Sequence, residues 1–133
     1  MMTRIRIMKR IRAIDSAIAL IAIKLMLLVI GFARTYALLQ SRVRDLSTTT
    51  EPDTATLDAS ARSIVAAAIL IPGRIECLEQ SLALWYLLRR RGVSAELTFG
   101  MRQYPFGAHA WVTYRGEPLN EDREALRHYV AFA

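Results

Sequence analysis

The sequence contains one cysteine, Cys77, and only two histidines, His109 and His128. A single cysteine cannot form an intramolecular disulfide, and a free thiol suits a reducing compartment. One cysteine and two histidines are also too few for the usual four-ligand structural zinc site. His128 lies in the C-terminal tail without catalytic context, and we expect it at the surface. These scarcities leave Cys77 as the one thiol available for chemistry.

Acidic residues are scarce in the first third of the chain. Residues 1–44 hold nine Lys or Arg and one acid, a net +8, whereas residues 45–133 hold nine Lys or Arg and eleven acids, a net −2, which together give the overall +6. The basic excess therefore belongs to the N-terminal segment, which can contact nucleic acid, anionic lipid or an acidic protein. No nucleic-acid-reading motif accompanies the charge, so we expect no nucleic-acid partner.

No internal repeat is visible, and 133 residues with 53% apolar content suffice for one domain with an appendage. The stretch 47–54 is the clearest boundary because its hydroxyl residues and Pro52 stop a helix, and Asp53 or Thr54 can cap the next one. We therefore divide the chain into a basic and apolar helical segment at 1–46, a linker at 47–54 and a core at 55–133.

Residues 16–33 form a helical run that is apolar on nearly every side, and residues 34–46 continue as a more polar helix. A basic stretch before an apolar run is typical of a signal anchor, but Lys24 in its middle costs about 2.5–3.5 kcal/mol on insertion. The alternative is a buried central helix, because residues 55–133 alone are a very small domain that needs covering. We favour the buried helix.

The core segment shows helical periodicity followed by strand-like alternation. A helix around residues 57–69 ends at Pro72-Gly73, and a second helix runs from Cys77 to Arg91 and is stopped by Gly92. Strands are predicted at 94–102, 108–114 and 118–121, with a turn at 104–107 and a hairpin turn at Arg115-Gly116. We expect a short helix or an irregular tail after residue 121.

Cys77 opens its helix, and His109 follows in an Ala-His-Ala-Trp strand. A helix N-terminus and a nearby imidazolium both favour the nucleophilic thiolate form of a cysteine. The imidazole can later hand its proton to a leaving amine. A thiol on a helix, an imidazole on a strand and an acid on the next strand is the order of papain- and transglutaminase-type enzymes. The structural alternative is that Cys77 is a small buried hydrophobe and His109 a core histidine beside Trp111.

The third member of such a site, an acid that orients the imidazole, is Glu121 or Asp122. A two-residue turn at Arg115-Gly116 would place Asn120 and Asp122 on the His109 face. A three-residue loop with a bulge would place Glu121 there instead, because one residue of register reverses the faces of a strand. The sequence leaves both registers open.

Six segments of the core stand out as a combination, and they are Pro72-Gly73, Cys77-Leu78, Ser81-Leu82-Ala83-Leu84, Leu87-Leu88-Arg89-Arg90-Arg91-Gly92, Gly100-Met101-Arg102 and Ala108-His109-Ala110-Trp111-Val112. Together these segments resemble the transglutaminase-like leader peptidases of lasso-peptide biosynthesis. The resemblance covers about residues 55–122 and is specific as a combination rather than in any single piece.

The resemblance implies a cysteine peptidase that removes the leader from a ribosomally made precursor, with Cys77 as nucleophile and His109 as general base and acid. Glu121 stands where the family usually has Asp, which leaves the third role in doubt, and Gln80 stands where Arg is common. The implied partners are the leader peptide, a separate leader-recognition protein and an ATP-dependent macrolactam synthetase. Residues 1–46 are too short and too uniformly helical for a fused recognition domain, so the chain resembles the split form.

We therefore predict an α+β fold with a papain- or transglutaminase-like core, in which the Cys77 helix packs on a small antiparallel sheet and N-terminal helices complete the core. The reaction is hydrolysis through an acyl-thioester, with backbone N–H groups at the start of that helix as oxyanion donors and no cofactor or metal. The alternatives are a transglutaminase or acyltransferase and a non-catalytic precursor-binding partner. We expect a cytoplasmic protein, with peripheral membrane contact through residues 1–33 as an open alternative.

Overall fold

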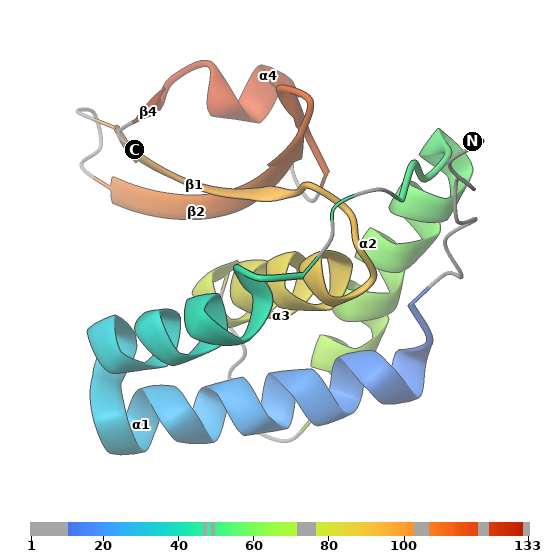
Figure 1. Ribbon diagram of the computed structural model, residues 1–133. Coiled ribbons are helices and arrows are strands. Elements are labelled where there is room, and N and C mark those ends of the chain that lie inside the picture. Colours follow the sequence, from blue (N-terminus) through green and yellow to red (C-terminus); the bar gives the residue numbers. More distant parts are fainter. Residues whose placement is uncertain are drawn as a thin grey trace.

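A computed structural model describes residues 11–46, 48, 50–71, 77–102, 107–119 and 123–131. The elements follow in the order α1 (Ala13–Val43), α2 (Thr54–Leu70), α3 (Cys77–Arg90), β1 (Glu96–Arg102), β2 (Gly107–Tyr114), β3 (Glu117–Pro118), α4 (Arg123–Leu126) and β4 (Val130–Ala131). The three long helices form one layer, and the sheet with α4 forms a second (Figure 1). This arrangement confirms the predicted α+β fold.

Gly31 interrupts α1 with φ of 81° and ψ of 173°, a backbone region open almost only to glycine. The chain reverses there, and residues 13–30 and 32–43 form two arms that lie side by side (Figure 1). The buried hydroxyl of Thr35 donates a 2.7 Å hydrogen bond to the Gly31 carbonyl. The helical character of this segment was predicted, but its reversal was not.

The start of α2 and both ends of α3 lie where the sequence predicts. The Asp53 carboxylate accepts a 2.7 Å hydrogen bond from the backbone N–H of Thr56, and hydrogen bonds from the Thr56 side chain and backbone lower the pKa of Asp53. Gly92 follows α3 in the left-handed conformation, with φ of 84°. The predicted helix stop at Pro72-Gly73 and residues 104–106 of the predicted turn at 104–107 lie outside the described residues, whereas Gly107 is the first residue of β2.

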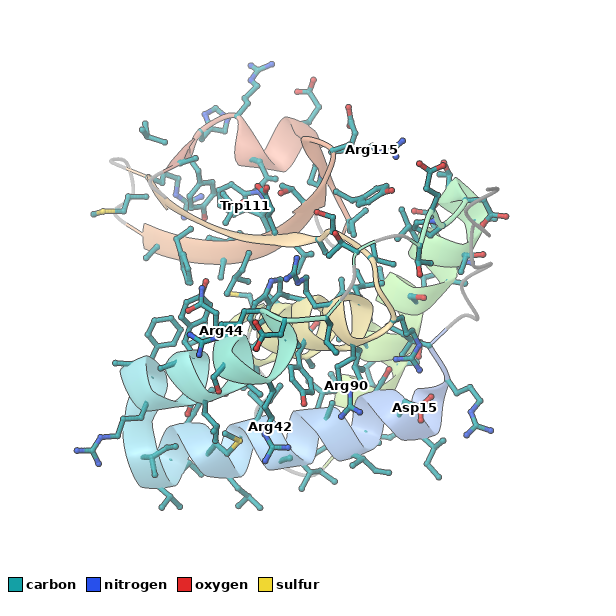
Figure 2. The ribbon with its side chains drawn as sticks, in the orientation of Figure 1. Asp15, Arg42, Arg44, Arg90, Trp111 and Arg115 are labelled. Carbon is teal, nitrogen blue, oxygen red and sulfur yellow. The ribbon has the colours of Figure 1, made fainter. Side chains whose placement is uncertain are left out.

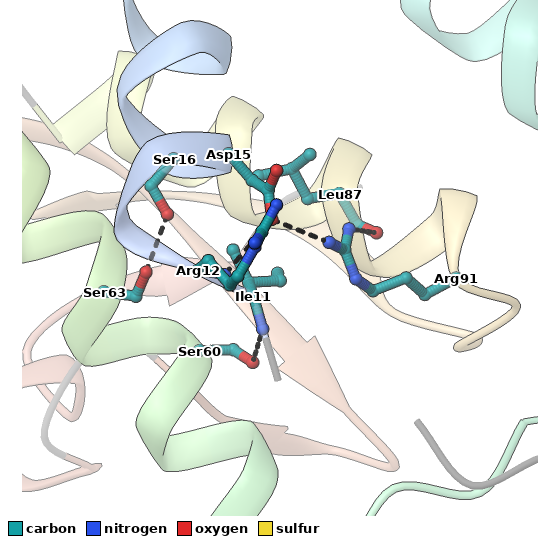
Figure 3. Close-up of polar contacts among 8 residues, drawn as sticks. All are labelled: Ile11, Arg12, Asp15, Ser16, Ser60, Ser63, Leu87 and Arg91. Carbon is teal, nitrogen blue, oxygen red and sulfur yellow. Dashed lines mark hydrogen bonds and ion pairs between the residues drawn. The ribbon is translucent and has the colours of Figure 1, made fainter. Parts of the chain in front are cut away.

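Polar contacts tie the first turn of α1 to α2 and α3 (Figure 3). They join Ser16 Oγ to Ser63 Oγ at 2.9 Å, the Ile11 backbone N–H to Ser60 Oγ at 3.2 Å, and Arg91 Nη2 to Asp15 Oδ2 at 3.3 Å. Desolvation lowers the pKa of Arg91, and the Asp15 carboxylate partly opposes that shift. The N-terminal segment is thereby docked on the rest of the chain.

A single hydrophobic core lies between the helices and one face of the sheet. Its members include Leu20 and Ile23 from α1, Leu82 and Leu88 from α3, and Val112 from β2. The N-terminal helix therefore completes the core, as predicted. The expectation of a buried central helix at residues 16–33 is wrong for one side of α1, where side chains such as Leu28 and Val29 are 74% and 79% exposed.

The sheet is antiparallel with strand order β3-β2-β1-β4. Arg115 and Gly116 form the β2–β3 turn with φ of 52° and 82°, and Tyr114 pairs with Glu117. Two positive φ values across a two-residue loop are the signature of a type I′ turn. The two-residue alternative for this hairpin is therefore confirmed. The strand predicted at 118–121 begins one residue earlier, at Glu117, and residues 120–121 lie outside the described residues, while β4 was not predicted.

Candidate active site

Cys77 and His109 line one pocket of about 300 Å³. Cys77 is the first residue of α3, and His109 is the third residue of β2. Both side chains are half-buried. The remaining residues that line this pocket are Phe32, Leu78, Phe99, Gly100, Ala108 and Ala110. Cys77 and His109, the catalytic pair predicted from the sequence, therefore line the same pocket.

A buried hydrogen bond sets the position of α3 on β2. The hydroxyl of Ser81, which is fully buried, donates to the carbonyl of Ala110 at 2.9 Å. Ser81 lies four residues after Cys77 and therefore on the same side of the helix. Ala110 is the neighbour of His109. Together with the core packing of α3 on β2, this contact holds the start of the candidate catalytic helix close to the strand segment that carries the imidazole.

The imidazole of His109 belongs to an aromatic cluster. Its ring centroid lies 5.9 Å from that of Trp111 and 5.5 Å from that of Tyr129, and the Arg102 guanidinium lies 5.3 Å from the Tyr129 ring. Trp111 lies on the side of the sheet that faces α4 (Figure 2). Because side chains alternate along a strand, His109 shares that side, whereas Ala110 and Val112 face α3.

The pocket thus lies at the end of the β1–β2 hairpin, where both sides of the sheet contribute to it. Gly100 stands directly opposite His109 in the β1–β2 pairing. The structure brings Cys77 and His109 to one pocket, and the imidazole stacks on Trp111 and lies tilted against Tyr129.

Sequence reasoning missed the role of Phe32, the residue after the α1 reversal. Phe32 lines the pocket and stacks on Tyr36, with ring centroids 5.8 Å apart. It also meets Phe99 edge-on at 5.7 Å, and Tyr36 stacks on Trp85 at 5.4 Å. This chain of rings links α1, α3 and β1, so the N-terminal segment supplies a wall of the site. The signal that could have revealed it is the Gly-Phe pair, which interrupts an otherwise aliphatic run.

The third candidate residue, Glu121, and its neighbour Asp122 lie outside the described residues. The two-residue turn between Tyr114 and Glu117 is the alternative for which the sequence predicts Asn120 and Asp122 on the His109 face, and that placement stays a prediction. The Leu119 backbone N–H still donates to the Val112 carbonyl at 2.9 Å, which continues this register one residue beyond Pro118. His128 is exposed, as expected.

Comparisons with known proteins agree with this architecture. A 46-residue segment, 35% of this chain, is 39% identical to the microcin J25-processing protein McjB of Escherichia coli. The match spans only 22% of the length of that relative. No solved structure matches the chain. The family model of the transglutaminase-like superfamily matches residues 17–132, which is most of the chain, and this protein therefore belongs to the transglutaminase-like superfamily.

Proposed function

We propose that this protein is a cysteine peptidase that removes the leader from a ribosomally made lasso-peptide precursor. The observation that carries the proposal is the shared pocket of Cys77 and His109, the only cysteine and the one histidine of the chain that lines it. Membership of the superfamily and the local similarity to a microcin-processing protein support the same class of substrate.

The chemistry follows from the residue types at the pocket. The thiolate of Cys77 attacks the carbonyl carbon of the scissile bond, and backbone N–H groups at the start of α3 donate to the oxyanion that forms. The C–N bond then breaks, and the His109 imidazolium gives its proton to the leaving amine. Water, deprotonated by the same imidazole, hydrolyses the thioester and releases the acid product and the thiol.

The third role belongs to Glu121 in this proposal, with Asp122 as the alternative that the hairpin register favours. Its carboxylate would orient the imidazole and stabilise the imidazolium. The proposal also requires the His109 imidazole, which packs against Trp111 and Tyr129, to come within hydrogen-bond reach of Cys77. Catalytic contacts are often incomplete in a free enzyme and form only when substrate is bound.

The partners follow from the size of the site. A pocket of about 300 Å³ with mainly apolar walls can hold one or two side chains and contributes little affinity by itself. A separate recognition protein that holds the leader would raise the effective concentration of the scissile bond. The freed amine would then be the substrate of an ATP-dependent macrolactam synthetase.

Cleavage by single-residue variants tests the mechanism. The full chain is mixed with a lasso-peptide precursor and its leader-recognition protein, and the products are identified by mass spectrometry. We expect two fragments whose masses sum to the precursor plus one water. Cys77→Ala and His109→Ala should each lower the rate by at least about 10³-fold. His128→Ala should retain the rate, because that imidazole is exposed and outside the pocket.

Three results would contradict the proposal. Cleavage by a folded Cys77→Ala variant at the wild-type rate would exclude the thioester mechanism. A joined product that has lost ammonia would instead identify the chain as a transglutaminase, in which an amine rather than water takes the acyl group. A protein that binds the precursor but releases no product with any partner would be the non-catalytic alternative.

A further inference from the structure

One face of the first arm of α1 presents large apolar side chains to solvent. The members of this face, called the outer face of α1 below, are Ile14, Ile18, Ile21, Leu25, Leu28 and Val29, which are between 47% and 79% exposed. The first five recur at alternating spacings of four and three residues, which places them on one stripe of the helix. Figure 2 shows a row of mostly carbon side chains that projects from α1 away from α2, α3 and the sheet.

The outer face contains no charged residue. Between Ser16 and Ala33 the one charged side chain is Lys24, which is half-buried and lies at the edge of the stripe. Contiguous apolar surface of this extent is rare on soluble proteins unless something covers it. The outer face is therefore an interaction surface rather than a chance cluster of exposed aliphatic residues.

The opposite face of the same arm holds α1 on the protein. Leu20 and Ile23 are buried at 0% and 2% exposure, and the Ser16 hydroxyl pairs with that of Ser63 on α2. By length and composition α1 could cross a bilayer, with a mean hydropathy of 2.5. If α1 crossed a bilayer, Leu20 and Ile23 would leave the protein core and the polar contacts shown in Figure 3 would be lost. A helix with one face docked and one face apolar suits a position flat on a surface.

The charge of the residues before α1 indicates which kind of partner surface the outer face of α1 contacts. Residues 1–12, directly before the helix, contain five Lys or Arg and no acid. The first acid in the chain, Asp15, already faces Arg91. A basic segment joined to an apolar helix face matches an anionic lipid surface, which attracts the charges while the acyl region accepts the aliphatic side chains.

A second copy of the chain fits less well. Two helices that pair through such a stripe usually carry opposite charges beside the seam. Here residues 1–44 hold nine Lys or Arg against one acid, so a symmetric pair would bring two basic segments together without acidic partners.

We propose that the outer face of α1 inserts into the interface of an anionic lipid bilayer, with the helix parallel to the membrane plane. Residues 1–12 neutralise lipid headgroups, and α2, α3 and the sheet stay on the aqueous side. The proposal depends only on the outer face of α1 and on the basic residues of segment 1–12. It can therefore be tested separately from the peptidase proposal.

Vesicle binding tests it directly. The full chain is sedimented with vesicles of phosphatidylcholine containing a third phosphatidylglycerol, and with vesicles of phosphatidylcholine alone. We expect binding to the anionic vesicles that weakens in high salt, and at least tenfold weaker binding to the neutral ones. Leu25→Glu with Leu28→Glu should lower anionic binding by at least tenfold. Val130→Glu is the matched control: it alters an equally exposed aliphatic residue on β4, in the other layer of the molecule, and should bind like the wild type (Figure 1).

The outcomes separate the candidate occupants of this face. Unchanged binding by the Leu25→Glu/Leu28→Glu variant, with its folding verified by circular dichroism, would overturn the proposal. So would a wild-type dimer in sedimentation velocity that the double substitution converts to a monomer, combined with no vesicle binding by either form. A monomer that binds anionic vesicles through these residues would support the membrane surface.

Discussion

At the scale of single residues, Gly100 is the position on which the surroundings of His109 depend most closely. A Cβ atom at Gly100 would lie 2.6 Å from Cη2 and 2.8 Å from Cζ3 of Trp111, and 3.2 Å from Cβ of Tyr129. We expect Gly100→Ala to displace the Trp111 ring and to lower the free energy of unfolding by about 1–3 kcal/mol, the usual cost of overpacking. Chemical denaturation measures the loss, and tryptophan fluorescence reports the moved ring.

Gly107→Ala is the matched control for that substitution. It lies on β2, and among the described residues a Cβ there would meet the Arg102 side chain at 3.6 Å, an ordinary contact distance. We expect its stability to stay within about 0.5 kcal/mol of the wild type or to rise slightly. Equal losses at both glycines would show that the strand backbone, and not the Trp111 ring, determines the cost.

The candidate catalytic residues could be chosen from the sequence because thiols and imidazoles are rare in this chain. Cys77 is the only thiol, and a helix start followed by a histidine-bearing strand narrows the choice of base. The contact between Tyr129 and His109 could not be predicted from the sequence in the same way. Tyr129 reaches the cluster because β4 pairs with β1, and a two-residue strand in a tail has too little periodicity to be predicted.

At the scale of elements, the reversal of α1 depends on one residue. In the part of the chain that the structure describes, no atom lies within 4 Å of the position that a Cβ at Gly31 would take, so an added methyl group meets open space. Its φ of 81° with ψ of 173° is nevertheless nearly inaccessible to other residues. We expect Gly31→Ala to lower the free energy of unfolding by about 1–3 kcal/mol through backbone strain alone, as measured by urea denaturation.

The same Gly107→Ala variant serves as the comparison for Gly31→Ala, since both add a methyl group to available space and only Gly31 has a positive φ. Because Phe32 follows the turn and lines the pocket, Gly31→Ala should also disturb the site. A Gly31→Ala protein as stable as the wild type would mean that the two arms of α1 can straighten into one helix without loss.

Helices and strands were predicted correctly where a hydrophobic periodicity extends over many residues. The prediction failed where the torsion angles of a single residue determine the path of the chain. The alternation of β1 and β2 and the periodicity of α2 and α3 extend over many residues, so single exceptions do not obscure them. The reversal at Gly31 is invisible to that logic, because apolar residues continue on both sides of it and the helix pattern does not change. The β2–β3 register was undecided for a similar reason, and the positive φ of Arg115 resolved it.

At the scale of the whole molecule, hydropathy predicted that α1 belongs to the core but not which side faces outward. A run apolar on every side carries no moment to orient it. Orientation came instead from contacts far apart in sequence, such as Ser16 with Ser63 and Asp15 with Arg91. Both faces of the first α1 arm are apolar, and only its contacts decide their roles. One face lies in the protein core, and the other is left exposed for a partner.

This division of α1 makes a prediction about two aliphatic residues of the same helix. Ile23→Ala should lower the free energy of unfolding by about 2–5 kcal/mol, because the side chain is 2% exposed and its loss leaves a cavity between α1 and the rest of the core. Leu25→Ala, at 56% exposure on the outer face, should change it by no more than about 0.5 kcal/mol. Thermal or urea unfolding without lipid measures both. If α1 were instead detached from the protein body in solution, the two substitutions would have the same small effect, and neither the docked inner face nor the proposed membrane-facing outer face would survive.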